Sequence, residues 1–284
     1  MRISYLLKKA FIGGKWSVGY REIDDKEYTI IPMEDAWIAD PFLFEYNGEH
    51  YLFVEYMNGK KGEIAYFKYI DCKPVFQKII ISEPYHLSYP CVFWQEGEVY
   101  MIPESADNHC IELYKAVKFP DKWEKVKKLK SGTYYDSTYF NYKGKDYLIG
   151  FSPIHNYHKL SLFSIDLKSK TLKLILEKKY KDNVGRPAGN LLFVDDTLIR
   201  PAQDCSRKYG ENIIFYRIKG LENEQYEEEM VKIISTSSIN DEYQRIHTYN
   251  RDSKYEVIDL YKESIKLSRP FTLIIKKSKQ VLNL

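Results

Sequence analysis

The feature of this sequence that most constrains its fold is an internal repeat. The segments DPFLFEYNGEHYLFVE (40–55), YPCVFWQEGEVYMIPE (89–104) and DSTYFNYKGKDYLIGF (136–151) align without a gap, and two weaker copies occupy 188–203 and 246–259. In the first copy, two runs rich in apolar and aromatic residues flank Asn47-Gly48, which is the strongest short-range signal for a β-hairpin. Each copy is therefore predicted to form two antiparallel strands.

Two further strand-like runs follow each of the first four hairpins, for example GEIAYFKY and VFQKIII after the first. Four strands in every ~50 residues are typical of β-propeller blades, whereas the two-residue alternation argues against helical repeats. The copies predict an all-β, five-bladed β-propeller with four-stranded blades. We expect the segment KWSVGYREI (15–23) to complete the fifth blade, so that N- and C-terminal segments close the ring and 1–284 forms a single domain.

Composition excludes several classes of partner. The formal net charge is +3, from 43 basic and 40 acidic residues, which is too even for the basic surface that binds nucleic acid. No apolar run reaches the ~18 residues of a membrane span, and the N-terminus lacks the pattern of a signal peptide. We therefore expect a cytoplasmic protein without a membrane span. The four cysteines lack a Cys-x-x-Cys spacing and are predicted to be reduced and mostly buried.

The open ends of the hairpins carry polar side chains. In a two-residue hairpin the positions equidistant from the turn face each other, which pairs Asp40 with Glu55. The same arithmetic pairs Tyr89 with Glu104, Asp136 with Phe151 and Ala188 with Gln203. If the hairpins are the inner strands of the blades, these ends converge on one face around the central channel. That rim would gather Asp40, Glu55, Tyr89, Glu104, Asp136, Gln203 and Asp204, with Ser88, Arg186, Arg200 and His86 close by.

Polar groups of both signs at one mouth indicate a binding or catalytic site, although acids at strand ends also brace neighbouring loops. Three carboxylates from different blades could supply the acid and base that act on a glycosidic bond. Asp40 is the predicted base and Glu104 the predicted acid. Asp136 would orient the substrate or tune the pKa of the acid. Tyrosines and tryptophans such as Trp37, Tyr85, Tyr89 and Tyr135 could stack on sugar rings or simply pack in the core.

The fourth copy adds a cationic element. GRPAGN (185–190) and RPAQDCSRKYG (200–210) contain Arg186, Asn190, Arg200, Arg207 and Lys208. The arginines could clamp the phosphate of a sugar phosphate or nucleotide-sugar, or the carboxylate of an acidic sugar. The alternative is a buried arginine paired with an acid such as Asp204, which would hold two blades together.

No cofactor is predicted, because the sequence contains no Gly-rich phosphate loop and no dinucleotide fingerprint. No metal site is predicted either, since HNYH (155–158) has no third ligand nearby. His247, at the inner strand of the fifth blade, could point into the channel and bind an ion or water.

The segments ADPFLFEYNGEHYLFVE, EPYHLSYPCVF, YMIPES, IELYKAVKFPDKW, RPAGNLLF and RPAQDCSRKYG resemble a known family. It is the domain at the N-terminus of plant glucosamine inositolphosphorylceramide transferases, which in bacteria also occurs alone or beside formyltransferase domains. The resemblance implies a five-bladed propeller akin to the arabinanase and fructosidase glycosidases.

For the site residues, the wider resemblance implies a base or nucleophile at Asp40 and a pKa-tuning or substrate-binding residue at Asp136. The glycosidases keep their general acid, a glutamate, on the fourth blade, where this chain has Arg186, Asn190, Gln203 and Asp204 instead. Glu104 or Glu55 would then have to act as the acid.

Three functional hypotheses follow. The first is an enzyme that makes or rearranges glycosidic bonds in surface-polysaccharide or glycoconjugate biosynthesis, a context that rests on the resemblance. The second is a glycoside hydrolase with a relocated acid, which the absent secretion signal disfavours. The third is a glycan-binding propeller without catalytic activity, which would position a glycan for a partner enzyme of glycan synthesis. The rim residues expected to bind substrate are Glu55, His86, Tyr89, Arg186, Asn190, Arg200, Gln203, Asp204 and His247.

Overall fold

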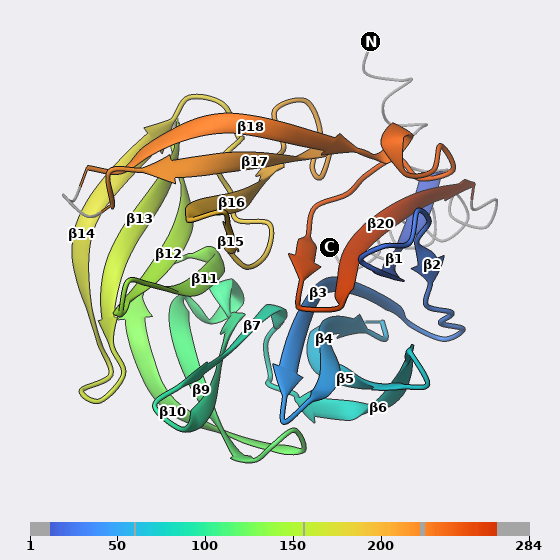
Figure 1. The fold of residues 1–284 in the computed structure, drawn as a ribbon, viewed down its shortest axis with the longest axis horizontal. Coiled ribbons are helices and arrows are strands. Elements are labelled where there is room, and N and C mark those ends of the chain that lie inside the picture. The colour runs from blue at the N-terminus through green and yellow to red at the C-terminus, as the bar shows by residue number, and fades with distance from the viewer. Residues whose placement is uncertain (1–11, 60, 156, 222–224, 266–284) are drawn as a thin grey trace, which may run out of the picture.

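The computed structural model describes residues 12–265, except 60, 156 and 222–224. Within these residues the chain forms five four-stranded antiparallel sheets arranged around a common centre (Figure 1). This confirms the predicted five-bladed propeller. The prediction of one domain from 1 to 284 extends at both ends beyond the described residues.

Each of the first four blades is continuous in sequence, with its first strand innermost. Blade one contains β3 (Trp37–Tyr46), β4 (Glu49–Met57), β5 (Gly62–Ile70) and β6 (Lys73–Ile81). Blade two contains β7 (Ser88–Gln95), β8 (Glu98–Glu104), β9 (Cys110–Lys118) and β10 (Lys122–Ser131). Blade three contains β11 (Tyr135–Tyr142), β12 (Lys145–Ile154), β13 (Tyr157–Asp166) and β14 (Thr171–Tyr180). Blade four contains β15 (Leu192–Val194), β16 (Thr197–Asp204), β17 (Asn212–Lys219) and β18 (Glu227–Ser235).

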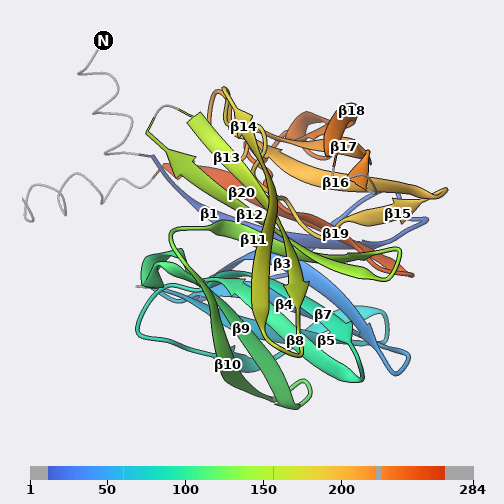
Figure 2. The same ribbon diagram turned by 90° about the vertical axis from the view of Figure 1, so that its left-hand side faces the viewer.

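The fifth blade joins the two ends of the chain. Its strands lie in the order β19 (Tyr249–Arg251), β20 (Tyr255–Ile265), β1 (Ile12–Glu22) and β2 (Thr29–Ile30). The β1–β20 ladder runs without interruption from the pair Ile12–Ile265 to the pair Glu22–Tyr255. In the side view β1 and β20 cross the molecule together, between blade four and blade one (Figure 2). The expectation that 15–23 completes the fifth blade is confirmed.

Apolar side chains pack mainly between adjacent blades. Phe42 of blade one meets Tyr89 of blade two edge to face at 4.7 Å, and Phe93 of blade two stacks on Tyr139 of blade three at 3.7 Å. The inner and middle strands are therefore largely buried, whereas the outermost strands β6, β10, β14 and β18 are mostly exposed. This gradient explains why the fourth run of each repeat is the most polar.

A β-bulge recurs at the open end of three blades and corrects the predicted register. In blade one Phe42 still faces Phe53, but Ala39 rather than Asp40 faces Glu55. Ser88 likewise faces Glu104, and Tyr135 faces Phe151. The extra residue in each bulge adopts a left-handed backbone: φ is 49° at Asp40, 46° at Tyr89 and 47° at Asp136. The bulge breaks the simple turn arithmetic, because two residues on one strand oppose one on the other.

Blade four departs from the predicted pairing as well, since Pro187 bridges to Ala202 and Ala188 does not face Gln203. Counting from the turn correctly places these residues at the open end of the hairpin, but the observed pairing is shifted by one residue on each strand.

Candidate functional site at the propeller mouth

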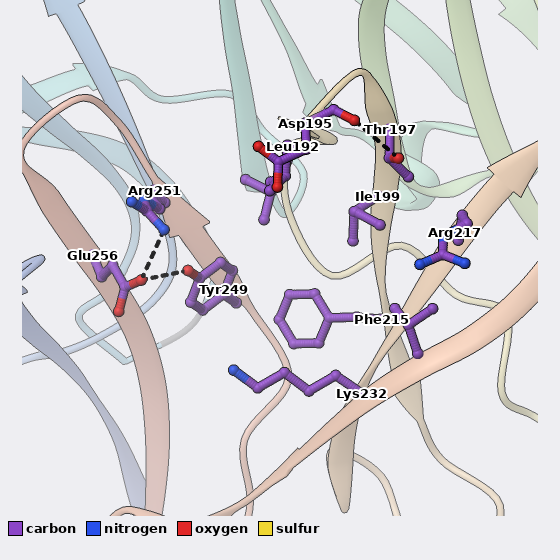
Figure 3. A pocket seen from close by; sticks show the side chains of 12 residues that line it. Leu192, Asp195, Thr197, Ile199, Phe215, Arg217, Lys232, Tyr249, Arg251 and Glu256 are labelled. Atoms are coloured by element: carbon purple, nitrogen blue, oxygen red, sulfur yellow. Dashed lines mark hydrogen bonds and ion pairs between the residues drawn. The ribbon is translucent and has the colours of Figure 1, made fainter.

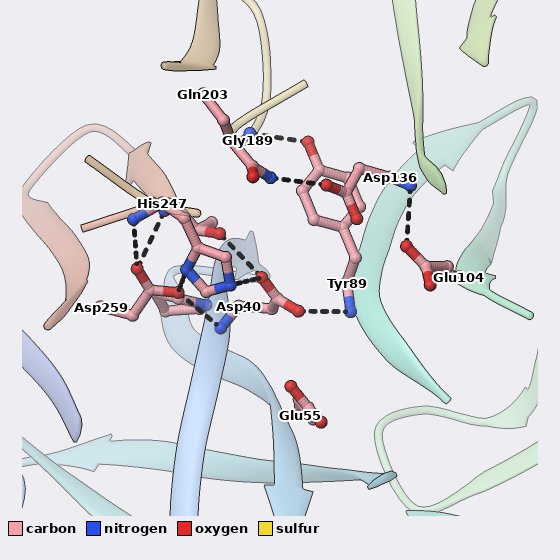
Figure 4. A network of polar contacts seen from close by, with 12 residues as sticks. Asp40, Glu55, Tyr89, Glu104, Asp136, Gly189, Gln203, His247 and Asp259 are labelled. Carbon is pink, nitrogen blue, oxygen red and sulfur yellow. Dashed lines mark hydrogen bonds and ion pairs between the residues drawn. The ribbon is translucent and has the colours of Figure 1, made fainter. Parts of the chain in front are cut away.

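Tyr89 lies on the propeller axis and ties three blades together. It is fully buried, its hydroxyl lies 2.9 Å from Thr138 Oγ1, and the amide of Gly189 donates to it at 2.6 Å (Figure 4). Gly189 has φ of 128°, and a Cβ at this position would lie 1.9 Å from the carbonyl oxygen of Tyr249. Only glycine fits here, because both the backbone angle and the close approach exclude a side chain.

Asp40 is the centre of a second group of contacts beside Tyr89. Its Oδ2 accepts the amide of Tyr89 at 3.2 Å, and its Oδ1 accepts the hydroxyl of Thr248 at 2.8 Å. His247 lies between two acids, with Nε2 3.4 Å from Asp40 and Nδ1 2.6 Å from Asp259. Asp259 also accepts the backbone amides of Asp40, His247 and Thr248. The carboxylate of Asp259 thus joins the last blade to the first at the mouth.

Glu104, Asp136 and Arg186 form a separate ionic group. Arg186 donates through Nε to Asp136 Oδ2 at 2.5 Å and through Nη2 to Asp136 Oδ1 at 3.1 Å. The same Nη2 donates to Glu104 Oε2 at 3.1 Å, and the amide of Asp136 donates to that oxygen too. Gln203 adds a hydrogen bond to Asp136 at 2.6 Å. Within the described part of the chain, both hydrogen bonds to Glu104 are accepted by Oε2.

Glu55 has a different environment. Its Oε1 lies 3.2 Å from His86 Nε2, and the amide of Gly62 donates to His86 Nδ1 at 2.8 Å. Because Nδ1 accepts a hydrogen bond, the ring proton must be on Nε2, which then donates to Glu55. Burial also lowers the pKa of His86. His86 is therefore a neutral donor to Glu55.

The mouth separates the proton affinities of its acids. Burial raises the pKa of Asp40 to about 6, while His247 opposes the rise. Burial and then the Asp136 carboxylate hold the pKa of Glu104 well above its usual range, and Arg186 offsets only part of this. Burial, followed by Asp40 and Glu104, likewise raises the pKa of Glu55. The mouth therefore combines Asp40, with a pKa of about 6, with two glutamates whose pKa values burial and the neighbouring acids hold above their usual range.

Aromatic rings border these acids. Trp16 stacks on His247 with ring centres 4.1 Å apart, and Tyr209 meets the same imidazole edge to face at 5.2 Å. The guanidinium of Arg186 lies 4.8 Å from the ring centre of Tyr135 and 5.6 Å from that of Tyr209. Tyr209 is exposed, so its ring is accessible from solvent.

The structure brings most of the predicted rim residues together. Asp40, Glu55, Tyr89, Glu104, Asp136, Arg186, Gln203 and His247 join one network of contacts and electrostatic interactions, with His86 on its border (Figure 4). Asn190 makes other contacts: its backbone amide donates to the side chain of Asn250, and the thiol of Cys91 lies 3.8 Å from its side-chain oxygen. Among the stacking candidates, Tyr135 lies against Arg186, whereas Tyr85 donates to Glu112 in blade two.

Arg200 and Asp204, which were predicted to bind substrate, make structural contacts within the protein instead. Arg200 is fully buried, and its guanidinium donates to Glu228, Tyr180 and the carbonyl of Gly185. This is the structural pairing that the sequence left open, but the partner is Glu228 rather than Asp204. Asp204 accepts hydrogen bonds from Ser206 and Asn212 within its own loop region. The exposed Arg207 pairs with Glu211.

Sequence reasoning missed Asp259, Thr248, Trp16 and Tyr209. Asp259 had a usable signal, because it ends the fifth copy of the repeat where Glu55 and Glu104 end the first two. Trp16 and Tyr209 lie outside the hairpin repeat, and only the closed ring brings them to His247.

Potential metal ligands among the described residues gather at Asp40, His247 and Asp259, whose donor atoms lie within 4.8 Å of one another. These atoms already bind one another and three backbone amides. Asp259 and Asp40 raise the pKa of His247 overall, although burial alone would lower it. A cation here would have to displace these contacts, so the group is better explained as a polar brace between the last blade and the first.

A cavity of about 440 Å³ lies between blades four and five, lined by residues other than those of the mouth (Figure 3). Its walls include Leu192, Ile199 and Phe215. Glu256, one of its acids, accepts hydrogen bonds from Tyr249 and Arg21. The cavity therefore lacks the closely coupled carboxyl groups that distinguish the mouth.

The architecture is that of the five-bladed propellers found in several glycoside hydrolases. The chain is similar to an exo-β-1,3-galactanase from Clostridium thermocellum (TM-score 0.61, 11% identity, covering 88% of this chain and 64% of the other). It is also similar to a Bombyx mori GH32 β-fructofuranosidase (TM-score 0.60, 11% identity, covering 90% of this chain and 60% of the other). A third similar structure is a GH43 endo-arabinanase from Bacillus licheniformis (TM-score 0.54, 14% identity, covering 81% of this chain and 95% of the other). At these identities the similarity shows the fold alone.

Sequence comparison shows the family. The chain belongs to the family described as glucosamine inositolphosphorylceramide transferase 1, N-terminal, whose family model matches residues 14–264. It is 31% identical over 228 residues to glucosamine inositolphosphorylceramide transferase 1 of Arabidopsis thaliana, covering 76% of this chain. The relative of Oryza sativa subsp. indica is 32% identical over 209 residues, covering 69%. The chain spans 30% and 28% of the lengths of these two relatives.

No helix among the described residues combines the length and apolar character needed to cross a bilayer.

Proposed function

We propose that the mouth binds a carbohydrate and catalyses the formation or rearrangement of a glycosidic bond by acid–base chemistry. The observation that carries this proposal is that Asp40, Glu104 and Asp136, from three different blades, lie in one buried polar network at the mouth, where burial raises the pKa values of Asp40 and Glu104. Asp40 would accept a proton from the attacking hydroxyl group, and Glu104 would donate one to the leaving oxygen. The curated relatives are named as transferases, which favours transfer to a sugar or lipid hydroxyl over hydrolysis.

The remaining mouth residues would support these roles. Asp136 raises the pKa of Glu104, and Arg186 and Gln203 fix the orientation of Asp136. Tyr209 and Tyr135 would offer ring faces to the sugar. A nucleotide-sugar is the donor that the transferase relationship suggests, and glycoconjugate biosynthesis is the corresponding context.

The test is to incubate the protein with nucleotide-sugars and candidate glycan or glycolipid acceptors and to measure product formation. Asp40→Asn and Glu104→Gln are each expected to lower kcat by roughly 10²–10⁴-fold, the usual contribution of a positioned acid or base. Glu98→Gln is a matched control, because Glu98 lies at the other end of β8 and its carboxylate, 45% exposed, binds Lys115. Full activity in both mouth variants would overturn the catalytic assignment.

A second candidate function is glycan binding without catalysis, in support of a partner enzyme of glycan synthesis. It is favoured by the nearly complete burial of Asp40, which is 4% exposed and has both oxygens engaged. Under this alternative, glycans would bind to the mouth, no turnover would occur with any donor, and Asp40→Asn would reduce the unfolding temperature.

A further inference from the structure

The charges of this chain are unevenly distributed along its sequence. Residues 1–11 and 266–284, here called the terminal segments, contain eight of the 43 lysines and arginines and none of the 40 aspartates and glutamates. Residues 12–265 therefore contain 35 basic and 40 acidic residues, and their formal net charge is −5. The charge of +3 for the whole chain thus combines a net acidic propeller with two strongly basic terminal segments.

Apolar residues are interspersed among the basic residues of both terminal segments. The first reads MRISYLLKKAF and the second KLSRPFTLIIKKSKQVLNL. Basic residues mixed with Leu, Ile and Phe are typical of segments that bind at a membrane surface, where both kinds of side chain contribute. An arm that binds nucleic acid is instead expected to be a block of like charges. Both terminal segments lie outside residues 14–264, which match the family model.

The structure brings the attachment points of the two terminal segments together. β1 and β20 are antiparallel, and their ladder ends at the pair Ile12–Ile265, so the chain enters and leaves the propeller at one place. Nearby charges of the propeller are paired, Lys262 with Glu242 and Arg245 with Glu263. The two segments can therefore act on one surface, and they carry the excess positive charge of the chain.

This place lies on the mouth side of the ring. Trp16 of β1 pairs with Tyr261 of β20 and stacks on His247 at the mouth. The pair Ile12–Ile265 lies four residues further along the same two strands, which corresponds to about 13 Å. The terminal segments are thus attached beyond the mouth, on the side from which a ligand would enter.

We propose that the two terminal segments together bind an anionic lipid surface and hold the propeller with its mouth towards that surface. The lysines and arginines would contact acidic headgroups, and the large apolar side chains would enter the boundary between headgroups and acyl chains. The net negative charge of residues 12–265 would oppose contact through the rest of the propeller. This proposal does not depend on the chemistry at the mouth.

The first experiment measures co-sedimentation of the whole chain with vesicles. Binding to vesicles of equal parts phosphatidylserine and phosphatidylcholine is expected to be at least about tenfold tighter than binding to phosphatidylcholine alone, and to weaken with added salt. Replacement by glutamine of five lysines of the terminal segments should remove this preference: Lys8, Lys9, Lys276, Lys277 and Lys279. The matched control removes the same charge from five exposed lysines of the propeller and should keep the preference: Lys73, Lys118, Lys122, Lys127 and Lys128.

A second variant separates a lipid surface from other polyanions. Leu273→Ser combined with Ile275→Ser keeps every charge, and it should weaken binding to the acidic vesicles because it removes side chains that would enter the bilayer surface. The proposal is overturned if both kinds of vesicle bind equally, or if the preference survives loss of the five terminal lysines. Equal losses in the control variant would also overturn it. Binding to double-stranded DNA as tight as to the acidic vesicles, and unaffected by the serine variant, would indicate a nucleic-acid partner instead.

The orientation is tested with a fluorescent label. Cys72 is exposed and the other three cysteines are buried, so a thiol-reactive dye labels Cys72 selectively. Cys72 lies in the turn between β5 and β6, on the face opposite the mouth. Ser264→Cys in a Cys72→Ser background moves the dye next to Ile265. Energy transfer to a labelled lipid should be stronger from position 264 than from position 72, and equal or reversed transfer would refute the orientation.

Discussion

At the scale of single residues, the acids of the mouth differ mainly in what surrounds them. Asp40 is held by a hydroxyl, an amide and an imidazole, and Glu104 shares an arginine with Asp136. Glu55 instead contacts the neutral imidazole of His86. The repeat in the sequence predicted which acids reach the rim. It could not predict their partners, because Arg186 and Asp259 come from segments far along the chain.

Glu55 should make stability depend on pH in a defined direction. Its folded-state pKa is raised, so its contribution to folding is full below the pKa of ~4.3 that it has in the unfolded chain and is lost as the pH rises through the folded-state pKa. Glu55→Gln should therefore gain stability relative to the wild type with increasing pH, by about 1 kcal/mol or more at pH 8. Urea unfolding at pH 5 and pH 8 measures this, and an unchanged difference between the two proteins would contradict it.

Arg186 should be as important for stability as for chemistry. Arg186→Met leaves Asp136 and Glu104 buried without a cation, which is expected to cost about 3–5 kcal/mol in the free energy of unfolding. Arg207→Met is the control, because Arg207 is 82% exposed in its pair with Glu211 and exposed pairs contribute about 0–1 kcal/mol. Chemical denaturation of both variants tests the comparison, and equal losses would show that Arg186 is not the charge balance of the mouth.

At the scale of elements, the strand order of the first four blades could be predicted because each hairpin and its two following strands are local in sequence. The bulges could not be predicted, since residues 40, 89 and 136 are Asp, Tyr and Asp and none is the glycine that usually marks a left-handed backbone. The inner strands β15 and β19 lie within the predicted fourth and fifth hairpins, but each is only three residues long. Contacts between these adjacent blades, such as the amide of Asn190 donating to Asn250, hold this part of the ring together.

The close contact between Gly189 of blade four and Tyr249 of blade five can be tested by replacing glycine with alanine. Gly189→Ala would place a Cβ 1.9 Å from the carbonyl oxygen of Tyr249, whereas Gly48→Ala would place one in open space, and both positions have positive φ. Gly48→Ala is expected to cost about 1–2 kcal/mol, the backbone penalty alone, and Gly189→Ala clearly more. Thermal unfolding should rank the two variants, and a smaller effect at Gly189 would mean that blades four and five do not meet as described.

At the scale of the whole molecule, closure of the ring depends on strands from opposite ends of the chain. β1 pairs with β20 along its full length, and Asp259 of β20 accepts the amide of Asp40 in blade one. The sequence supported closure only through a leftover strand before the first repeat. The partner of that strand could be inferred by counting strands, but the contacts that fasten the ring at the mouth could not.

Removing residues 1–24 should therefore leave the ring open. The truncated chain is expected to lose its single cooperative unfolding transition and to self-associate, because β20 would lose its pairing partner and expose an unpaired edge. Calorimetry and size-exclusion chromatography measure both effects. A chain that lacks only residues 1–11 is the control, because it keeps β1. If both truncated chains unfold and self-associate in the same way, the prediction is contradicted.

The bulges at Asp40, Tyr89 and Asp136 have a consequence for protein engineering. All three present a side chain at the mouth from the same left-handed backbone, two of them as carboxylates and one as a phenol that fills the axis. The three positions are thus structurally equivalent, and a substitution at any of them changes the side chain that the bulge presents at the mouth. A library limited to residues 40, 89 and 136 would alter the depth and charge of the mouth, and asparagine, which tolerates this backbone well, is its natural starting substitution.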